Sequence, residues 1–432
     1  MKSFGILEKE SRIILNSIPE LISKTFPIPG KYRGALPYDI AELSKLLTNS
    51  RGERSLSYLS RPNYLSAYLY YFLPWNLYRL CILLPSFELK LLAGDIITDL
   101  GCGPLTFASA LWISRPDLRA IPLEFNCVDR SGPVLDAGKK FFTALCEFTE
   151  SKNSKESGLY NNDSLAWKIN LKKKDININK NASLSDSAGY NKAALVCAVN
   201  MFNEQYDRIS HNNTASLRNM AKNAALFMHS EAAQSASLLT VEPGVPQSGR
   251  FISLLREAFI ELGRMPSAPC THTADCPLLH TAKFSMDTGN NTSSRHAVST
   301  NEQRQRKQKH PHAVKQHTKK ERWCHFAFET ADAPKDLRSL SAAAKLQKDR
   351  LVFSFLLTGE VKKAKTQFVR VISDAFPLPG GKFGRYACSS QGLVLVTGGK
   401  NLIENTGSLS SLKQTTADER DVKSGAIIME LK

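Results

Sequence analysis

The strongest constraint on the fold is a regular alternation between short apolar runs and segments with helical periodicity. Apolar runs occupy residues 96–100, 123–129, 194–200 and 237–243, and a helix-like pattern follows each run, directly or after an intervening segment. A chain that alternates strands with helices places its strands parallel and covers both faces of the sheet with helices. The sequence therefore predicts an α/β fold built on a parallel sheet.

The segments on either side of this core have different patterns. Residues 1–92 show helical periodicity broken by prolines, which predicts a helical N-terminal subdomain. We assign residues 93–265 to the α/β domain and residues 266–350 to a cysteine-containing region. In residues 351–432, short apolar runs separated by glycine turns predict a small antiparallel sheet or barrel.

A glycine turn follows the first apolar run. In DLGCGPLT, Gly101 and Gly103 let the backbone approach a ligand closely, and the free N–H groups of the next helix can bind it. Asp129 ends the second run, where a carboxylate can accept hydrogen bonds from both hydroxyls of a ribose. These features predict a nucleotide-type site, although a dinucleotide enzyme or a sheet without cofactor would contain the same elements.

Candidate catalytic residues follow the third apolar run. Asn200, Asn203 and Glu204 are expected at the carboxyl edge of the sheet, where open α/β folds bind their substrates. Turn formation and helix capping explain the same residues equally well. Because the chain has no Asp/Asn-Pro-Pro-Tyr signature there, the sequence leaves the acceptor atom of any reaction open.

Four of the nine cysteines share a polar, turn-rich setting. They are Cys270 and Cys276 in APCTHTADCPL, Cys324 in RWCHF, and Cys388 in RYACSS. Four thiolates can hold a zinc ion or a four-iron four-sulfur cluster, and a Cys-Pro step such as Cys276-Pro277 also ends one ferredoxin ligand run. Neighbouring histidines leave a mixed zinc site open, and unrelated structural cysteines are the remaining alternative.

The order of these motifs resembles a class I S-adenosylmethionine-dependent methyltransferase, with DLGCG as the first motif and VDRS as the second. The resemblance implies that Asp99, Gly101 and Gly103 flank the methionine end of S-adenosylmethionine and that Asp129 holds the ribose. Leu105 stands where a third glycine is usual, which predicts a narrower approach for the cofactor.

A more specific resemblance comes from VEPG with the downstream Arg250, APC-x5-CP, WCHF and a late cysteine near a Gly-Leu-Val strand. This order resembles the small-ribosomal-subunit methyltransferase-like family, which occurs in bacteria and on the mitochondrial small subunit. The resemblance implies a four-iron four-sulfur cluster on Cys270, Cys276, Cys324 and Cys388, completed by residues 351–432, with zinc as the alternative. It also implies contact with the RNA and proteins of the small ribosomal subunit during assembly or translation.

Three functions are consistent with this resemblance. The first is methylation of ribosomal RNA with S-adenosylmethionine. The second is a non-catalytic assembly factor that keeps the fold as an RNA-binding scaffold. The third is methylation of a protein or a small molecule.

The charge of the chain favours an RNA partner. Its 432 residues contain 57 Lys and Arg against 40 Asp and Glu, a net charge of +17. Residues 281–322, between Cys276 and Cys324, hold ten Lys and Arg against three Asp and Glu. Their polar composition predicts a flexible basic insert.

The sequence also suggests a location. Residues 64–84 are the most apolar region, but Pro74, Asn76 and Arg79 interrupt them, which favours buried helices over a membrane span. The N-terminal residues fit neither a secretory signal nor a mitochondrial presequence. We therefore expect a monomer with reduced cysteines in a bacterial-type cytoplasm, associated with the ribosome and not with a membrane.

Overall fold

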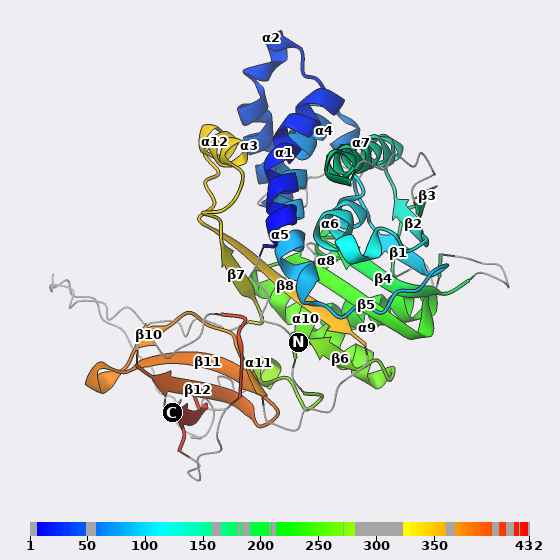
Figure 1. Ribbon diagram of the computed structural model, residues 1–432. Helices are drawn as coiled ribbons and strands as arrows, with labels where there is room; N and C mark the ends of the chain where they lie inside the picture. Colours follow the sequence, from blue (N-terminus) through cyan, green and yellow to red (C-terminus); the bar gives the residue numbers. More distant parts are fainter. Residues whose placement is uncertain are drawn as a thin grey trace, which may run out of the picture.

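A computed structural model (Figure 1) shows the α/β architecture that the alternating pattern predicts. It describes residues 7–48, 58–157, 166–179, 183–184, 191–206, 209, 213–270, 272–280, 323–359, 368–399, 406–411, 419–422 and 424–430, the side chains of 152–157, 280, 410, 411 and 430 excepted. The basic insert 281–322 lies outside these residues.

The main sheet has the strand order β3-β2-β1-β4-β5-β8-β6, and β7 pairs with β8. Strands β1 to β5 are parallel, whereas β8 runs antiparallel to β5, β6 and β7. Parallel strands followed by one antiparallel strand are typical of the class I methyltransferase-like fold, so the predicted fold class is confirmed. The strands are β1 (Ile96–Leu100), β2 (Leu123–Asp129), β3 (Trp167–Lys173), β4 (Ala193–Val199), β5 (Ala232–Pro243), β6 (Pro266–Ala268), β7 (Phe326–Glu329) and β8 (Arg350–Thr358).

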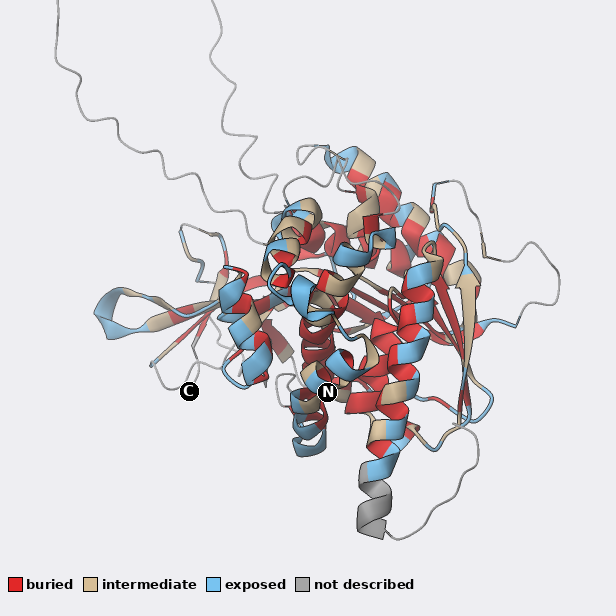
Figure 2. Ribbon diagram, turned by 90° about the horizontal axis from the view of Figure 1, so that it is seen from above, coloured by how far each residue is buried: buried red, intermediate tan, exposed pale blue. Residues whose placement is uncertain are grey.

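Helices cover both faces of this sheet, as the burial pattern in Figure 2 shows. On β4, Leu195 and Cys197 pack with the helices of one face, whereas Val196 and Ala198 pack with those of the other. This alternation follows from the two-residue period of a strand, and it explains why the strand is apolar throughout. The first face carries α6 (Thr106–Ser114) and α7 (Gly132–Ser157), and the second carries α9 (Thr214–Glu231) and α10 (Pro246–Glu261).

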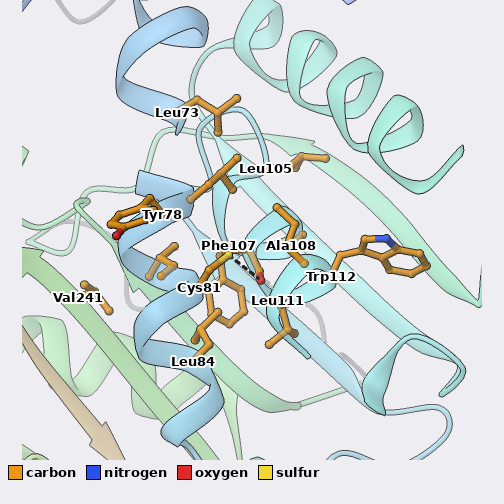
Figure 3. Packing of buried hydrophobic residues seen from close by; sticks show 14 of the residues in the cluster. Leu73, Tyr78, Cys81, Leu84, Leu105, Phe107, Ala108, Leu111, Trp112 and Val241 are labelled. Atoms are coloured by element: carbon orange, nitrogen blue, oxygen red, sulfur yellow. Dashed lines mark hydrogen bonds between the residues drawn. The ribbon is translucent and has the colours of Figure 1, made fainter. Parts of the chain in front are cut away.

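The N-terminal helices share the core of the first face. Helix α5 (Leu73–Leu83) packs against α6, and Cys81 of α5 lies beside Phe107 of α6 (Figure 3). The Cys81 thiol donates to the Ala110 carbonyl at 3.7 Å. The remaining helices of this region are α1 (Lys9–Thr25), α2 (Gly30–Arg33), α3 (Leu36–Thr48) and α4 (Pro62–Ala67), followed by a π-helical turn (Tyr68–Phe72).

A segment that contains Ser341 and Leu346 packs on these helices. The Tyr71 hydroxyl donates to the Leu346 carbonyl at 3.0 Å, and the Trp75 indole donates to Ser341 Oγ at 3.1 Å. Ser341 belongs to α12 (Lys335–Ala343), which lies beside α3 in Figure 1. The N-terminal helices are therefore bound into the α/β core through contacts distant in sequence.

A second sheet forms the C-terminal part of the chain, shown in orange and red in Figure 1. Its described strands have the order β13-β9-β11-β12-β14, with β10 paired to β11. Strands β12 and β14 are parallel, so the sheet is mixed, whereas the sequence predicted an antiparallel one. The strands are β9 (Phe368–Val371), β10 (Phe376–Pro377), β11 (Phe383–Ser389), β12 (Gly392–Gly398), β13 (Leu409–Ser411) and β14 (Ile427–Glu430).

The boundary expected at residue 351 differs from the structure. Strand β8, assigned from sequence to the small C-terminal region, lies in the main sheet between β5 and β6. Phe353, Phe355 and Leu357 face one cluster of the core, whereas Leu356 faces the other. Burial on both faces requires an apolar run with little alternation, which a short edge strand would not need. The second sheet therefore begins at Phe368.

Candidate functional site

The glycine turn lies where β1 meets α6, as predicted. Gly101 and Gly103 have φ values of +68° and +53°, in the left-handed region that glycine adopts without strain. The N–H groups of Gly101 and Cys102 donate to the Val128 carbonyl at 2.8 and 3.0 Å, which fixes the turn against β2. A side chain on Gly101 would place its Cβ 2.4 Å from Met201 Cγ, so only glycine fits.

A small pocket opens beside this turn, with an empty volume of about 250 Å³. The turn, the end of β4 and the N-terminal helices all contribute to it. Its lining residues are Tyr68, Asn76, Asp99, Gly101, Cys102, Gly103, Thr106, Phe107, Val199 and Asn200. Three residues proposed for the methionine end of a cofactor, Asp99, Gly101 and Gly103, thus share one cavity.

Asp99 presents a carboxylate at the base of this pocket. Its side chain is 1% exposed; Oδ1 accepts a hydrogen bond from the Cys197 thiol at 3.4 Å, and Oδ2 is buried without a partner. Burial raises the pKa of Asp99 to about 7, which the Cys197 hydrogen bond partly opposes. An unpaired buried acceptor of this kind is suited to a ligand that donates hydrogen bonds.

Burial of Asp99 makes stability depend on pH. Its pKa of about 7 in the folded protein lies above the unfolded value of about 4, so the folded state binds the proton more tightly. The stabilisation is complete below about pH 4 and is lost as the pH rises toward 7, by up to about 1.4 kcal/mol per pH unit. We expect the melting temperature to fall from pH 5 to pH 7, and to fall less in Asp99→Asn; equal slopes in thermal melts would contradict this assignment.

Asp129 lies at the end of β2 and accepts a hydrogen bond from the glycine turn. Its Oδ2 accepts from the Gly103 N–H at 3.0 Å and its Oδ1 from the Ser131 N–H at 2.9 Å. Burial raises the pKa of this carboxyl, and the two backbone hydrogen bonds oppose that rise. Asp129 does not line the pocket beside Asp99, although each of its oxygens retains a lone pair for a further donor.

The three candidate catalytic residues lie together at the carboxyl edge of β4, but their environments differ. Asn200 lines the pocket with φ +54°, and its Oδ1 is buried without a partner. Glu204, in α8 (Asn203–Tyr206), accepts from Arg130 Nη2 at 2.9 Å and from the Tyr58 hydroxyl at 3.3 Å. The Asn203 N–H donates to Glu242 Oε2 at 3.2 Å. Of the three residues, only Asn200 lines the pocket.

Sequence reasoning missed the contribution of the N-terminal helices. Tyr68 begins the π-helical turn and Asn76 lies on α5, and both line the pocket. Burial raises the pKa of the Tyr68 hydroxyl, so it stays protonated at neutral pH. A π-turn often marks a functional site in a structure. In the sequence these residues belong to an apolar stretch that predicted only buried helices.

Leu105 does not narrow the pocket as predicted. It adopts φ +54°, an uncommon conformation for a leucine, but its side chain is fully buried in the core of the first face. Figure 3 shows it beside Leu73 and Ala108, and it is absent from the pocket lining. The missing third glycine therefore leaves the cavity open.

The four cysteines singled out from sequence line a second cavity, with an empty volume of about 450 Å³ that includes solvent at its opening. Cys270 follows β6, Cys276 precedes α11 (Pro277–His280), and Cys324 precedes β7. Cys388 lies on β11 of the second sheet. The cavity therefore lies between the main sheet and the C-terminal sheet, with thiols supplied from both sides.

Two buried arginines hold the loop that carries Cys270. Arg256 Nη2, from α10, donates to the carbonyls of His272 and Ala274 at 2.8 and 2.7 Å. Arg370 Nε, from β9, donates to the Pro269 carbonyl at 3.0 Å. Both guanidinium groups line the cavity, where they would stabilise negative charge.

Burial disfavours the charged form of three of the four thiols in this cavity. Burial raises the pKa values of Cys270, Cys324 and Cys388, and for each the neighbouring cysteines raise it further while arginines lower it. Four thiolates in one buried cavity would therefore require compensation by cations. Within the described residues, no group of three His, Cys, Asp or Glu is placed to hold a single metal ion.

Comparison with models of known protein families finds one similarity. Residues 177–322 match the Rsm22 family model, described as mitochondrial small ribosomal subunit Rsm22. The matched residues include β4, β5, α10, Cys270 and Cys276. No curated protein matches the sequence.

Several solved structures resemble the chain at low identity. An S-adenosylmethionine-dependent methyltransferase from Clostridium acetobutylicum is 13% identical, with a TM-score of 0.20, 37% of this chain covered and 48% of that one. A Thermoplasma acidophilum protein described as a methyltransferase is 16% identical, with a TM-score of 0.22 and coverage of 41% and 54%. The chain thus spans about half the length of these two structures. A Haloferax volcanii complex of the Trm112 methyltransferase activator with its methyltransferase is 9% identical, with a TM-score of 0.26 and coverage of 67% and 90%.

No helix formed by the described residues is both long enough and apolar enough to cross a bilayer.

Proposed function

We propose that this protein binds the RNA of the small ribosomal subunit and methylates it with S-adenosylmethionine during assembly or translation. The observation that carries the ribosomal part is the match of residues 177–322 to the Rsm22 family model. The pocket beside the glycine turn supports the cofactor part, because conformation and steric contact restrict Gly101 to glycine.

The residues of this pocket fit the proposed cofactor. S-adenosylmethionine, when bound, supplies an activated methyl group. Asp99, Gly101 and Gly103 would hold its methionine end, and Asp129 would accept from the ribose hydroxyls with its remaining lone pairs. The carboxyl edge of β4, with Asn200, Asn203 and Glu204, is the proposed place of the acceptor, since open α/β sheets bind substrates there.

We further propose that Cys270, Cys276, Cys324 and Cys388 hold a four-iron four-sulfur cluster. Zinc bound by four thiolates needs all four sulfurs about 2.3 Å from one point. All four cysteines line one cavity, which supports a shared centre, and the family resemblance favours the cluster over zinc. Arg256 and Arg370 would stabilise the net negative charge of a cluster ligated by four thiolates.

The proposed location follows from the ribosomal partner. The Rsm22 description names the mitochondrial small subunit, whereas the sequence analysis predicts a bacterial-type cytoplasm. Ribosome association is common to both, so we propose a ribosome-associated protein that acts as a monomer.

Transfer of labelled methyl groups tests the proposed activity. Anaerobically isolated protein is incubated with small ribosomal subunits and methyl-labelled S-adenosylmethionine. Label in the small-subunit RNA is the expected result, and it should disappear in Gly101→Ala. Label only in protein would favour the third function considered from sequence, and the absence of any label would contradict the enzymatic proposal.

A non-catalytic assembly factor is the second candidate. One observation favours it: both oxygens of Asp129 already accept backbone hydrogen bonds, and Asp129 does not line the pocket. Under this alternative the protein binds small-subunit RNA with an affinity that S-adenosylmethionine does not change. Calorimetry without detectable S-adenosylmethionine binding, together with tight RNA binding, would select it.

Binding to RNA should depend steeply on salt. Neutralising even a few phosphates releases counterions, so we expect the dissociation constant to rise at least about tenfold between ~50 and ~200 mM salt. Replacing the ten Lys and Arg of residues 281–322 with Gln should reduce the slope of log Kd against log salt. Filter binding measures both, and an unchanged slope would exclude the basic insert from the RNA interface.

A further inference from the structure

We propose that Arg79 and Asn76 on α5 orient the amide of Asn200, so that Asn200 Oδ1 and Asp99 Oδ2 together accept hydrogen bonds from a ligand ammonium group. The inference rests on the proposed function, under which this group is the α-amino group of S-adenosylmethionine. It makes the N-terminal helices part of the ligand site, with Arg79 and Asn76 as positioning residues.

The orientation of the two amides follows from the chemistry of Arg79. A guanidinium group only donates hydrogen bonds, so the Asn76 atom 2.7 Å from Arg79 Nη2 is the oxygen Oδ1. The same oxygen lies 3.5 Å from the amide of Asn200, which must therefore present its nitrogen Nδ2 there. Arg79 is only 7% exposed, so its guanidinium is held in place by the protein core.

This orientation leaves an acceptor directed away from Asn76. Asn200 Oδ1 is buried and has no hydrogen-bond partner, and Asn200 lines the pocket. Asp99 Oδ2 is buried and unpartnered in the same way, and Asp99 lines the same pocket. Two orphaned acceptors in one small cavity match a group that donates several hydrogens, as an ammonium does.

The negative charge of the Asp99 carboxylate favours a cationic group on the ligand. A buried carboxylate is costly without a cation, and the proximity of Asp129 adds to that cost at Asp99. The nearest buried cation on α5, Arg79, is directed to Asn76. A ligand ammonium would compensate Asp99, and Asn200 would complete its hydrogen bonds without adding charge.

Backbone strain at Asn200 is consistent with this role. Its φ of +54° is uncommon outside glycine, although Asn tolerates it better than most residues. Strained backbone conformations of this kind recur at functional sites.

Two ligands that differ by one group test the inference. Calorimetry compares S-adenosylhomocysteine with its desamino analogue, which keeps the carboxylate and lacks only the amine. Wild-type protein should bind the amine-bearing ligand at least about tenfold more tightly. Asn200→Gly, which permits the same backbone conformation, and Asn76→Leu should each remove most of this preference and leave affinity for the desamino analogue unchanged.

A conservative variant separates loss of the Asn200 amide orientation from loss of the folded structure. In Asn76→Asp the carboxylate can still accept from both Arg79 and Asn200, so the preference for the amine should be retained. Asn219→Ala, a change at an exposed residue of α9, serves as the matched control. Thermal melts of all variants confirm that each is folded.

The outcomes distinguish this inference from the proposed function. Wild-type protein that binds neither S-adenosylmethionine nor S-adenosylhomocysteine would contradict the proposed function itself. Wild-type binding with no preference for the amine, or equal losses for both ligands in Asn200→Gly and Asn76→Leu, would overturn the inference alone. Failure of Asn76→Asp to retain the preference would overturn the orientation by Arg79.

Discussion

Anaerobically isolated Cys388→Ala should be colourless, whereas the unmodified protein should be brown with broad visible absorbance. Cys388 lies on β11 of the second sheet, whereas the other three cysteines belong to the segments next to β6, α11 and β7. Removing its thiol takes away the ligand from that side of the cavity, so a cluster would lose one of its four attachments. Loss of bound iron, measured together with the spectrum, should accompany loss of colour.

The same substitution should loosen the second sheet. The apolar contacts between the two parts near the cavity are few and include Cys276, Leu278, Ile372 and Leu393. A centre held from both sides would add bonds to this small cluster. We therefore expect limited proteolysis to release the C-terminal region from Cys388→Ala faster than from the unmodified protein.

A matched control is Cys146→Ala, because Cys146 is fully buried on α7 and does not line the cavity. It should keep its colour and its resistance to protease, with only a modest loss of stability. A colourless unmodified protein with stoichiometric zinc would contradict the cluster. An unmodified spectrum in Cys388→Ala would exclude Cys388 as a ligand.

Gly101→Ala should abolish measurable binding of S-adenosylmethionine. The new methyl group would lie 2.4 Å from Met201 Cγ, and alanine is strained at φ +68°. Relief of this contact requires the turn or the β4–α8 connection to move, and both border the pocket. We expect about 3 kcal/mol of destabilisation, from backbone strain and overpacking together.

Gly94→Ala provides the matched control for backbone strain. Gly94 has φ +86°, but an added Cβ would meet nothing within 4 Å, and the residue lies before β1, away from the pocket. It should cost about 1 kcal/mol and leave affinity for S-adenosylmethionine unchanged. Calorimetry and denaturant unfolding measure the two effects; equal affinity in Gly101→Ala and the unmodified protein would show that the glycine turn is not part of a ligand site.

Local sequence predicted the core of the fold well. The bounds of β1 and β2 agree with the apolar runs, because a strand buried on both faces and followed by a glycine turn is recognisable without its neighbours. The structure adds strand β3, whose lysines interrupt the apolar pattern. Strand β8 was assigned to the wrong sheet because its pairing with β5 depends on tertiary contacts that a linear pattern does not contain.

For the candidate sites too, the sequence predicted some residues and missed others. Motif residues such as Asp99 and Gly101 are contiguous in the chain, so the sequence showed their association directly. Asn76 reaches the pocket only through packing of α5 against the sheet, and in the sequence it is visible only as an interruption of an apolar region. The cysteines were identified by type and setting, whereas the arginines that border their cavity come from α10 and β9.

Cross-linking to small ribosomal subunits is the most direct test of the proposed function. Purified protein is irradiated with small-subunit particles, and the attached RNA is sequenced. The account predicts cross-links concentrated at one region of the small-subunit RNA and reduced at high salt. Absence of cross-links, or cross-links spread equally over the RNA of both ribosomal subunits, would contradict it.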